Sequence, residues 1–192
     1  MDSLIGVGVG LGLAAAAGFR IFIPLLALSI GAASGKLPLA SGFEWVGATP
    51  ALIAFGTAAV LEVLGYFIPY VDHLLDVVAT PAAVGAGMLA TAALATELPP
   101  LLKWSAVIIG GGGLAGLVQG ATALLRLKST ALTGGAGNPA VATFELFGSV
   151  TMLILALVLP LLAVGLALFL VVAVFRKTGR LLFGRKTATP SP

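Results

Sequence analysis

Long stretches without a charged residue are the feature that most limits what this chain can fold into. The ranges 77–96, 104–125 and 146–175 contain 20, 22 and 30 residues without Asp, Glu, Lys or Arg. Each is long enough to cross a membrane, since a helix needs about 20 apolar residues to span the hydrocarbon layer. Only 9% of the 192 residues are charged and the mean hydropathy is +1.16, whereas about 25% of a soluble domain is charged. The sequence therefore predicts an integral membrane protein.

We expect an all-α integral membrane protein with about six transmembrane helices, because the strict alternation of a membrane barrel is missing. The predicted spans are 4–33, 48–68, 73–95, 104–126, 139–158 and 160–176. Some spans are short or broken by Pro or Gly. Arg20 and Pro24 fall inside the first span, which favours a kink or a break into two pieces, and Pro160 favours a tight turn between the last two. A shift of 106 residues aligns Arg20 with Arg126 and indicates a weak internal repeat.

The distribution of charge predicts the domain organisation and the orientation. Residues 1–176 are expected to form a single transmembrane domain, and residues 177–192 a flexible basic tail. Five of the ten basic residues lie within the last 17 positions. Because basic residues mark the cytoplasmic side, six spans would place the 127–138 loop, the tail and both termini in the cytoplasm. The predicted location is the bacterial inner membrane.

Composition excludes several classes of site and partner. The chain has no cysteine and one histidine, so it has no disulfide, no thiolate metal site and no pair of imidazoles. Basic residues are not interleaved with aromatic ones, so nucleic acid is not an expected partner; the lipid bilayer is. Gly8-x-x-x-Gly12 and Gly112-x-x-x-Gly116 have the spacing of closely packed membrane helices. They favour packing within one subunit, with a homodimer or higher oligomer as the alternative.

Four carboxylates are predicted at membrane depth, where a charged side chain costs about 2.5–3.5 kcal/mol on insertion scales. Glu62 and Glu145 each lie about 10 Å inside their span, at 1.5 Å per residue. Asp72 and Asp76 are one helical turn apart at the start of the third span. These side chains, from three spans, can share one depth. They are the expected ligands of a proton or a hard cation, including a metal ion such as Na⁺ or Mg²⁺, and no other cofactor is expected.

Other polar residues are predicted near the same depth. Asn138 follows the glycine-rich segment 133–137 and adds an amide to the expected ion-binding set. Arg20, Arg126 and Lys128 are expected either to tune the charge of the carboxylates or to hold phosphate. The simpler alternative is that these side chains form structural ion pairs.

Three ordered motifs also carry a family resemblance. They are Gly18-Phe19-Arg20-x-Phe22-x-Pro24-Leu25-Leu26, Glu62-x6-Pro69-x-x-Asp72-x3-Asp76, and Gly137-Asn138-Pro139-x4-Phe144-Glu145. Together they resemble the uncharacterised bacterial integral membrane family called domain of unknown function 4126, over roughly residues 5–175. The pattern differs at Tyr66, Thr143 and Leu146, where the family often has Asp, Ser and an acidic residue. The resemblance implies one membrane fold and no particular activity.

Three functions fit these features. The first is a small transporter or channel whose carboxylate cluster binds a cation or a proton. The second is a lipid or lipid-phosphate translocase or binding protein that uses Arg20, Arg126 and Lys128. The third is a membrane scaffold subunit that transports nothing. An enzyme is less expected, because the second Asp-rich motif of intramembrane transferases is not present.

Overall fold

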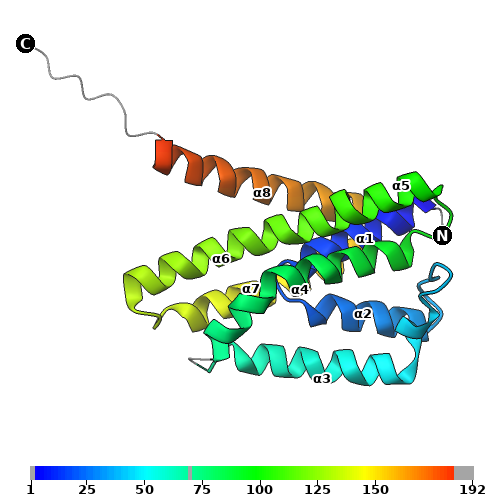
Figure 1. Cartoon of the computed structure of the whole chain (residues 1–192), viewed down its shortest axis with the longest axis horizontal. Helices are drawn as coiled ribbons and strands as arrows, with labels where there is room; N and C mark the ends of the chain where they lie inside the picture. The colour runs from blue at the N-terminus through cyan, green and yellow to red at the C-terminus, as the bar shows by residue number, and fades with distance from the viewer. Residues whose placement is uncertain (1–2, 69–70, 184–192) are drawn as a thin grey trace, which may run out of the picture.

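The computed structural model describes residues 3–68 and 71–183, without the side chains of residues 72–74, 76, 174–175 and 177–183. Within these ranges the chain is helical and has no strand, which confirms the predicted all-α class. The helices pack into an elongated bundle (Figure 1). Their order is α1 (Ser3–Ala17), α2 (Phe22–Ala33), the short 3-10 helix η1 (Glu44–Gly47), α3 (Thr49–Gly65), α4 (Val71–Leu94), α5 (Pro100–Ser105), the π-helical segment η2 (Ala106–Gly112), α6 (Gly113–Thr133), α7 (Asn138–Val158) and α8 (Pro160–Phe183).

The first predicted span, 4–33, is a helical hairpin. Helix α1 enters from one end of the bundle, the chain turns near the middle, and α2 returns to the same end (Figure 1). The start of α1 and the end of α2 line one groove together with the α7–α8 junction, so they lie at the same end. Consequently α1 begins and α8 ends at opposite ends of the bundle. This arrangement differs from the expectation that both termini share one side, because the hairpin does not cross the bundle.

Two residues explain why the helix breaks here. Pro24 has no amide hydrogen for the Arg20 carbonyl, and its ring would clash with that carbonyl in a continuous helix. Gly18 packs directly on α6, where an added Cβ would lie 2.7 Å from the Ala115 carbonyl oxygen. The chain therefore turns between Gly18 and Ile21, and this turn is buried between α4, α6 and α7.

The remaining predicted spans correspond to the observed helices, and proline marks where many of these helices begin. Prolines occupy the first turn of α3, α5, α7 and α8, where the missing amide costs nothing. A non-helical Leu159 separates α7 from α8, which confirms the predicted tight turn. Helix α8 continues over 177–183, into the segment expected to be a flexible tail, and residues 184–192 lie outside the described part.

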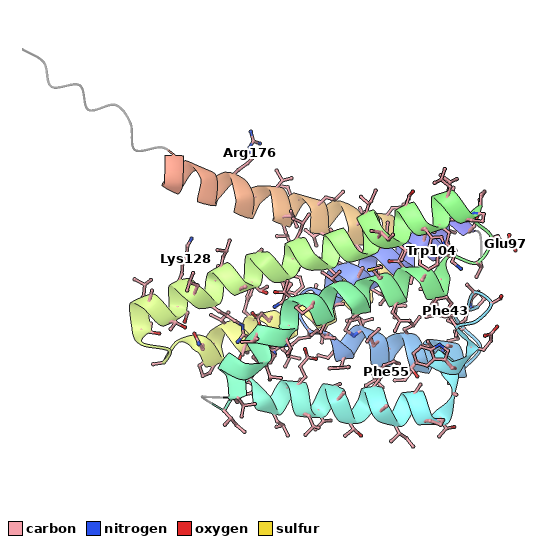
Figure 2. The ribbon with its side chains drawn as sticks, in the orientation of Figure 1. Phe43, Phe55, Glu97, Trp104, Lys128 and Arg176 are labelled. Carbon is pink, nitrogen blue, oxygen red and sulfur yellow. The ribbon has the colours of Figure 1, made fainter. Side chains whose placement is uncertain are left out.

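Three helical stretches are apolar and long enough to cross a membrane: Val77–Leu94, Pro100–Thr133 and Asn138–Val158. The other apolar helices are shorter. Both tryptophans are about half exposed, and Trp104 lies at the end of the bundle where α1 begins (Figure 2). Lys128 and Arg176 lie toward the opposite end.

The glycines predicted to allow close packing do so within the chain. A Cβ at Gly12 would lie 2.6 Å from the Ala156 Cβ on α7, and one at Gly112 would lie 2.9 Å from Met88 on α4. Gly8 faces Pro160 and Gly116 faces Val84. Both predicted glycine pairs therefore pack against other helices of the same subunit, which agrees with the favoured interpretation.

A close approach of the backbones of α4 and η2 generates a stability prediction. An added Cβ at Gly87 would lie 2.5 Å from the Gly111 carbonyl oxygen, and backbone atoms cannot move aside easily. We expect Gly87→Ala to lower the free energy of unfolding by about 1–3 kcal/mol. Gly85→Ala on the same helix is the matched control, because a Cβ there meets nothing within 4 Å. That change should be neutral or stabilising by up to about 1 kcal/mol. Thermal unfolding in detergent, followed by circular dichroism, measures both; equal effects would contradict the packing described here.

Candidate functional site

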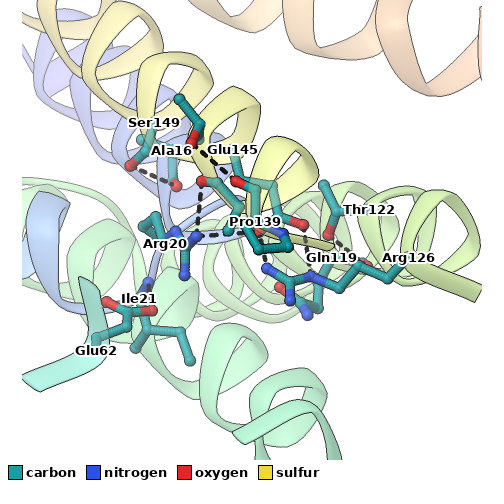
Figure 3. A network of polar contacts seen from close by, with 12 residues as sticks. Ala16, Arg20, Ile21, Glu62, Gln119, Thr122, Arg126, Pro139, Glu145 and Ser149 are labelled. Carbon is teal, nitrogen blue, oxygen red and sulfur yellow. Dashed lines mark hydrogen bonds and ion pairs between the residues drawn. The ribbon is translucent and has the colours of Figure 1, made fainter. Parts of the chain in front are cut away.

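Glu145 is the centre of a buried ionic network (Figure 3). It lies on α7, and its side chain is 2% exposed. Arg126 of α6 donates from Nε to Glu145 Oε1 at 2.8 Å and from Nη2 to Oε2. Arg20, in the turn of the hairpin, places Nη2 at 3.4 Å from the same Oε2. One carboxylate therefore neutralises part of the charge of two guanidinium groups and joins α6, α7 and the hairpin.

Tyr66 contacts both arginines from the residue that follows α3. The Arg20 Cζ lies 4.0 Å from the centre of its ring, and the Arg126 Cζ lies 4.1 Å from it. Cation–π contacts away from water contribute up to about 2 kcal/mol each. The two arginines that the weak repeat aligns thus share the same partners. Their local structures differ, because Arg20 lies in a turn and Arg126 lies inside a helix.

Arg20 has spare hydrogen-bonding capacity although only 1% of it is exposed. Its Nη2 donates to the Ala142 carbonyl at 2.8 Å. Its Nε and Nη1 have no hydrogen-bond acceptor among the described residues. A buried donor without an acceptor is costly. Since two of its three nitrogens have no such acceptor, Arg20 is held by its charge and by the Tyr66 ring more than by hydrogen bonds.

Glu62 binds the hairpin at a different place. Its Oε1 accepts the Ile21 amide at 2.8 Å, and its Oε2 accepts the Phe22 amide at 3.0 Å. These amides are at the start of α2 and have no partner within that helix. The carboxylate also faces the positive end of the helix dipole. Glu62 therefore caps α2 from α3, across the buried break in the chain.

Glu62 and Tyr66 are the two polar residues among those lining a pocket of about 630 Å³. The pocket lies between the start of α2, the second half of α3 and the first half of α4. Each of the two side chains is about 6% exposed, whereas Leu61 and Val78 in the same lining are 63% and 55% exposed. The pocket is therefore apolar at its rim and polar at its inner end. Neither arginine lines it.

The other predicted carboxylates and the metal site can be described only in part. Asp72 and Asp76 lie on α4, each one residue after a pocket-lining residue, but their side chains lie outside the described residues. Among the side chains that are described, no three of the His, Cys, Asp or Glu type come together as a metal site requires. Glu62 and Glu145 form separate sets of hydrogen bonds.

Two further predicted residues lie apart from the network. Asn138 begins α7, and its amide group exchanges hydrogen bonds of 3.2 and 3.3 Å with the Thr130 hydroxyl on α6. That contact joins the two helices beside their connecting turn. Lys128 is exposed on α6 and points away from the bundle (Figure 2). The structure thus brings Arg20 and Arg126 together without Lys128.

A family model described as "Domain of unknown function (DUF4126)" matches residues 7–180. The matched range contains every side chain of the ionic network and the residues that line the Glu62 pocket. No curated protein and no solved structure matches the chain.

The network generates a second stability prediction. Glu145→Gln leaves two buried guanidinium groups without their shared carboxylate, so we expect the free energy of unfolding to fall by about 3–5 kcal/mol. Ser149→Ala, one turn along the same helix, removes only the 3.1 Å hydrogen bond to the Ala16 carbonyl and should cost about 0.5–1.5 kcal/mol. Chemical or thermal unfolding in detergent compares the two variants. A Glu145→Gln protein as stable as Ser149→Ala would show that the ion pairs contribute little.

Proposed function

The chain belongs to this family of unknown function, and from its geometry we propose that it is a small membrane transporter in which Glu62 binds a proton or a cation. The family description names no activity, so the proposal stands on the site. Three groups of observations support it: the apolar exterior, the broken helix, and the position of Glu62.

The exterior favours a membrane environment. Long helices carry large apolar side chains on their outer faces, including Leu132, Phe147 and Leu161, each more than 60% exposed. Water would penalise such a surface, whereas lipid would not. The buried polar groups have the opposite distribution, since Arg20, Arg126 and Glu145 are inside the bundle. The location we propose is the bacterial inner membrane.

The position of Glu62 is the observation that carries the proposal. Ionisable residues at membrane depth are costly and usually mark a pathway for ions or protons. Glu62 is buried, yet it lines a pocket that is large enough for a ligand. It also lies at the break of a discontinuous helix, which is where many transporters bind substrates and coupling ions. Val71 and Leu75, in the first turns of α4, line the same pocket.

Glu145 has a different role in this proposal. Its oxygens are engaged by two arginines, so it holds the hairpin against α6 and α7 and is not a cation ligand. A phosphate site is less well supported, because both arginines are directed at Glu145 and Lys128 is elsewhere. The scaffold alternative differs from ours in one respect: it does not require the charge of Glu62.

The orientation follows from the basic residues at the end of α8. We propose that this end faces the cytoplasm, because it carries Arg176 and the basic residues that follow. The hairpin then begins and ends on the outer side, so the N-terminus is outside and the C-terminus inside.

The transport proposal predicts the behaviour of Glu62→Gln in liposomes. Purified protein is reconstituted into liposomes that contain a pH-sensitive dye to detect protons or a sodium-sensitive dye to detect sodium, and a potassium gradient with valinomycin supplies the driving voltage. We expect the protein to raise the flux above that of empty liposomes and Glu62→Gln to lose at least about nine-tenths of the increase, because the variant cannot carry charge at this position. Glu44→Gln, at an exposed glutamate, should keep the flux.

Two outcomes would count against transport by Glu62. The first is that liposomes with the original chain, with Glu62→Gln and with Glu44→Gln all show the same flux as empty liposomes, which would favour a scaffold. The second is an unchanged flux in Glu62→Gln. Circular dichroism and elution volume establish that the variant folds, and the Gln carbonyl can still accept one of the two α2 amides.

The hairpin predicts which positions can be labelled from outside. The chain has no cysteine, so single cysteines can be introduced without a background. In intact bacterial cells, a membrane-impermeant maleimide should label both Ser3→Cys and Ser34→Cys, but not Ala136→Cys between α6 and α7. A continuous first span would put residues 3 and 34 on opposite sides, so labelling of only one of them would overturn the hairpin in the membrane.

A further inference from the structure

The shape and lining of the Glu62 pocket identify the class of substrate. We infer that the pocket between α2, α3 and α4 binds an organic cation with an apolar body, whose charge lies beside Glu62. The inference rests on the proposed function, since it names the class of cation that the Glu62 carboxylate binds.

Size and lining favour an organic ligand over an inorganic ion. The pocket holds about 630 Å³, far more than a metal ion occupies. Except for Glu62 and Tyr66, its lining residues are apolar, and they include Phe22, Ala58, Leu61 and Val78. Burial of an apolar body against such a lining contributes about 25 cal/mol per Å². An inorganic ion would gain nothing from these walls.

The charges of the lining favour a cation over an anion. Glu62 is the ionisable carboxylate of the described lining, and both nearby arginines point to Glu145, outside the pocket. Each Glu62 oxygen accepts one backbone amide, which leaves lone pairs for a ligand.

The gradient of exposure sets the orientation of the ligand. The rim carries exposed Leu61 and Val78, while Glu62 and Tyr66 close the inner end. In a membrane this rim faces lipid. An amphipathic cation from the lipid layer would therefore enter with its charge toward Glu62 and leave its apolar part against the rim.

The test uses tetraphenylphosphonium, a permanent cation with an apolar body, and its neutral analogue triphenylphosphine oxide. Isothermal titration of the purified full chain in detergent, corrected for empty micelles, should detect binding of the cation and at least about tenfold weaker binding of the neutral compound, a difference of about 1.4 kcal/mol. Glu62→Gln should weaken binding of the cation by at least about tenfold.

A pair of alanine variants tests the location without touching the carboxylate. Ala58→Phe fills the pocket from α3 and should also weaken binding by at least about tenfold. Ala54→Phe, one turn earlier on the same helix and exposed outside the lining, should leave it within about twofold. Both variants keep Glu62 and its amide partners. They therefore test whether the cation binds in this pocket even if Glu62→Gln fails to fold.

The outcomes separate this inference from the transport proposal. Flux that depends on Glu62, without binding of tetraphenylphosphonium, overturns the substrate class and leaves the transporter intact. Equal binding of the neutral compound, or binding insensitive to both Glu62→Gln and Ala58→Phe, also overturns it. Binding that is insensitive to both variants would place the cation elsewhere, as in the apolar groove of about 1190 Å³ between the hairpin and the α7–α8 junction.

Discussion

A helix break inside the bundle is the constraint on which the rest of this structure depends. The first amides of α2 are buried and have no carbonyl from the preceding turn, because α1 has already ended. Leaving two such donors without acceptors would cost about 1–3 kcal/mol each. Glu62 supplies both acceptors from α3. The turn also buries Arg20, whose charge needs an anion; Glu145 provides it and pairs with Arg126 as well.

The sequence predicts the helices better than their arrangement. Runs without charge and prolines in first turns mark α3, α4 and α7 to within a few residues, and also the start of α8, because both signals are local. The break at Arg20 and Pro24 fits a kink as well as a hairpin. The contacts that accompany the hairpin join residues far apart in the sequence, such as Gly18 with α6 and Glu62 with the start of α2. The depth of Glu62 and Glu145 follows from counting residues. Their partners do not, because these depend on how the helices are rotated. Tyr66 is not among the predicted site residues, since an aromatic residue at the end of an apolar run has the pattern of an interfacial residue.

The two buried glutamates have different partners and different roles. Glu145 is held by two guanidinium groups, and removing either partner would leave an uncompensated charge in a medium of low dielectric constant. Glu62 is held by neutral amides and borders open space. A change in its charge or its ligand therefore breaks no hydrogen bond of Glu145, although Arg20 interacts electrostatically with both glutamates. In the transport proposal, this separation allows Glu62 to change state while Glu145 keeps its contacts with Arg20 and Arg126.

The central position of α1 bears on how the protein is assembled. This helix contacts α4, α6, α7 and α8, all of which are synthesised after it. At 15 and 12 residues, neither α1 nor α2 is long enough to cross the hydrocarbon layer alone, and their connection carries a cation. Helix α1 can therefore dock on α4 and α6 first, and its burial is complete only when α7 and α8 are in place. We expect these two helices to close the bundle over a helix that precedes them in the chain.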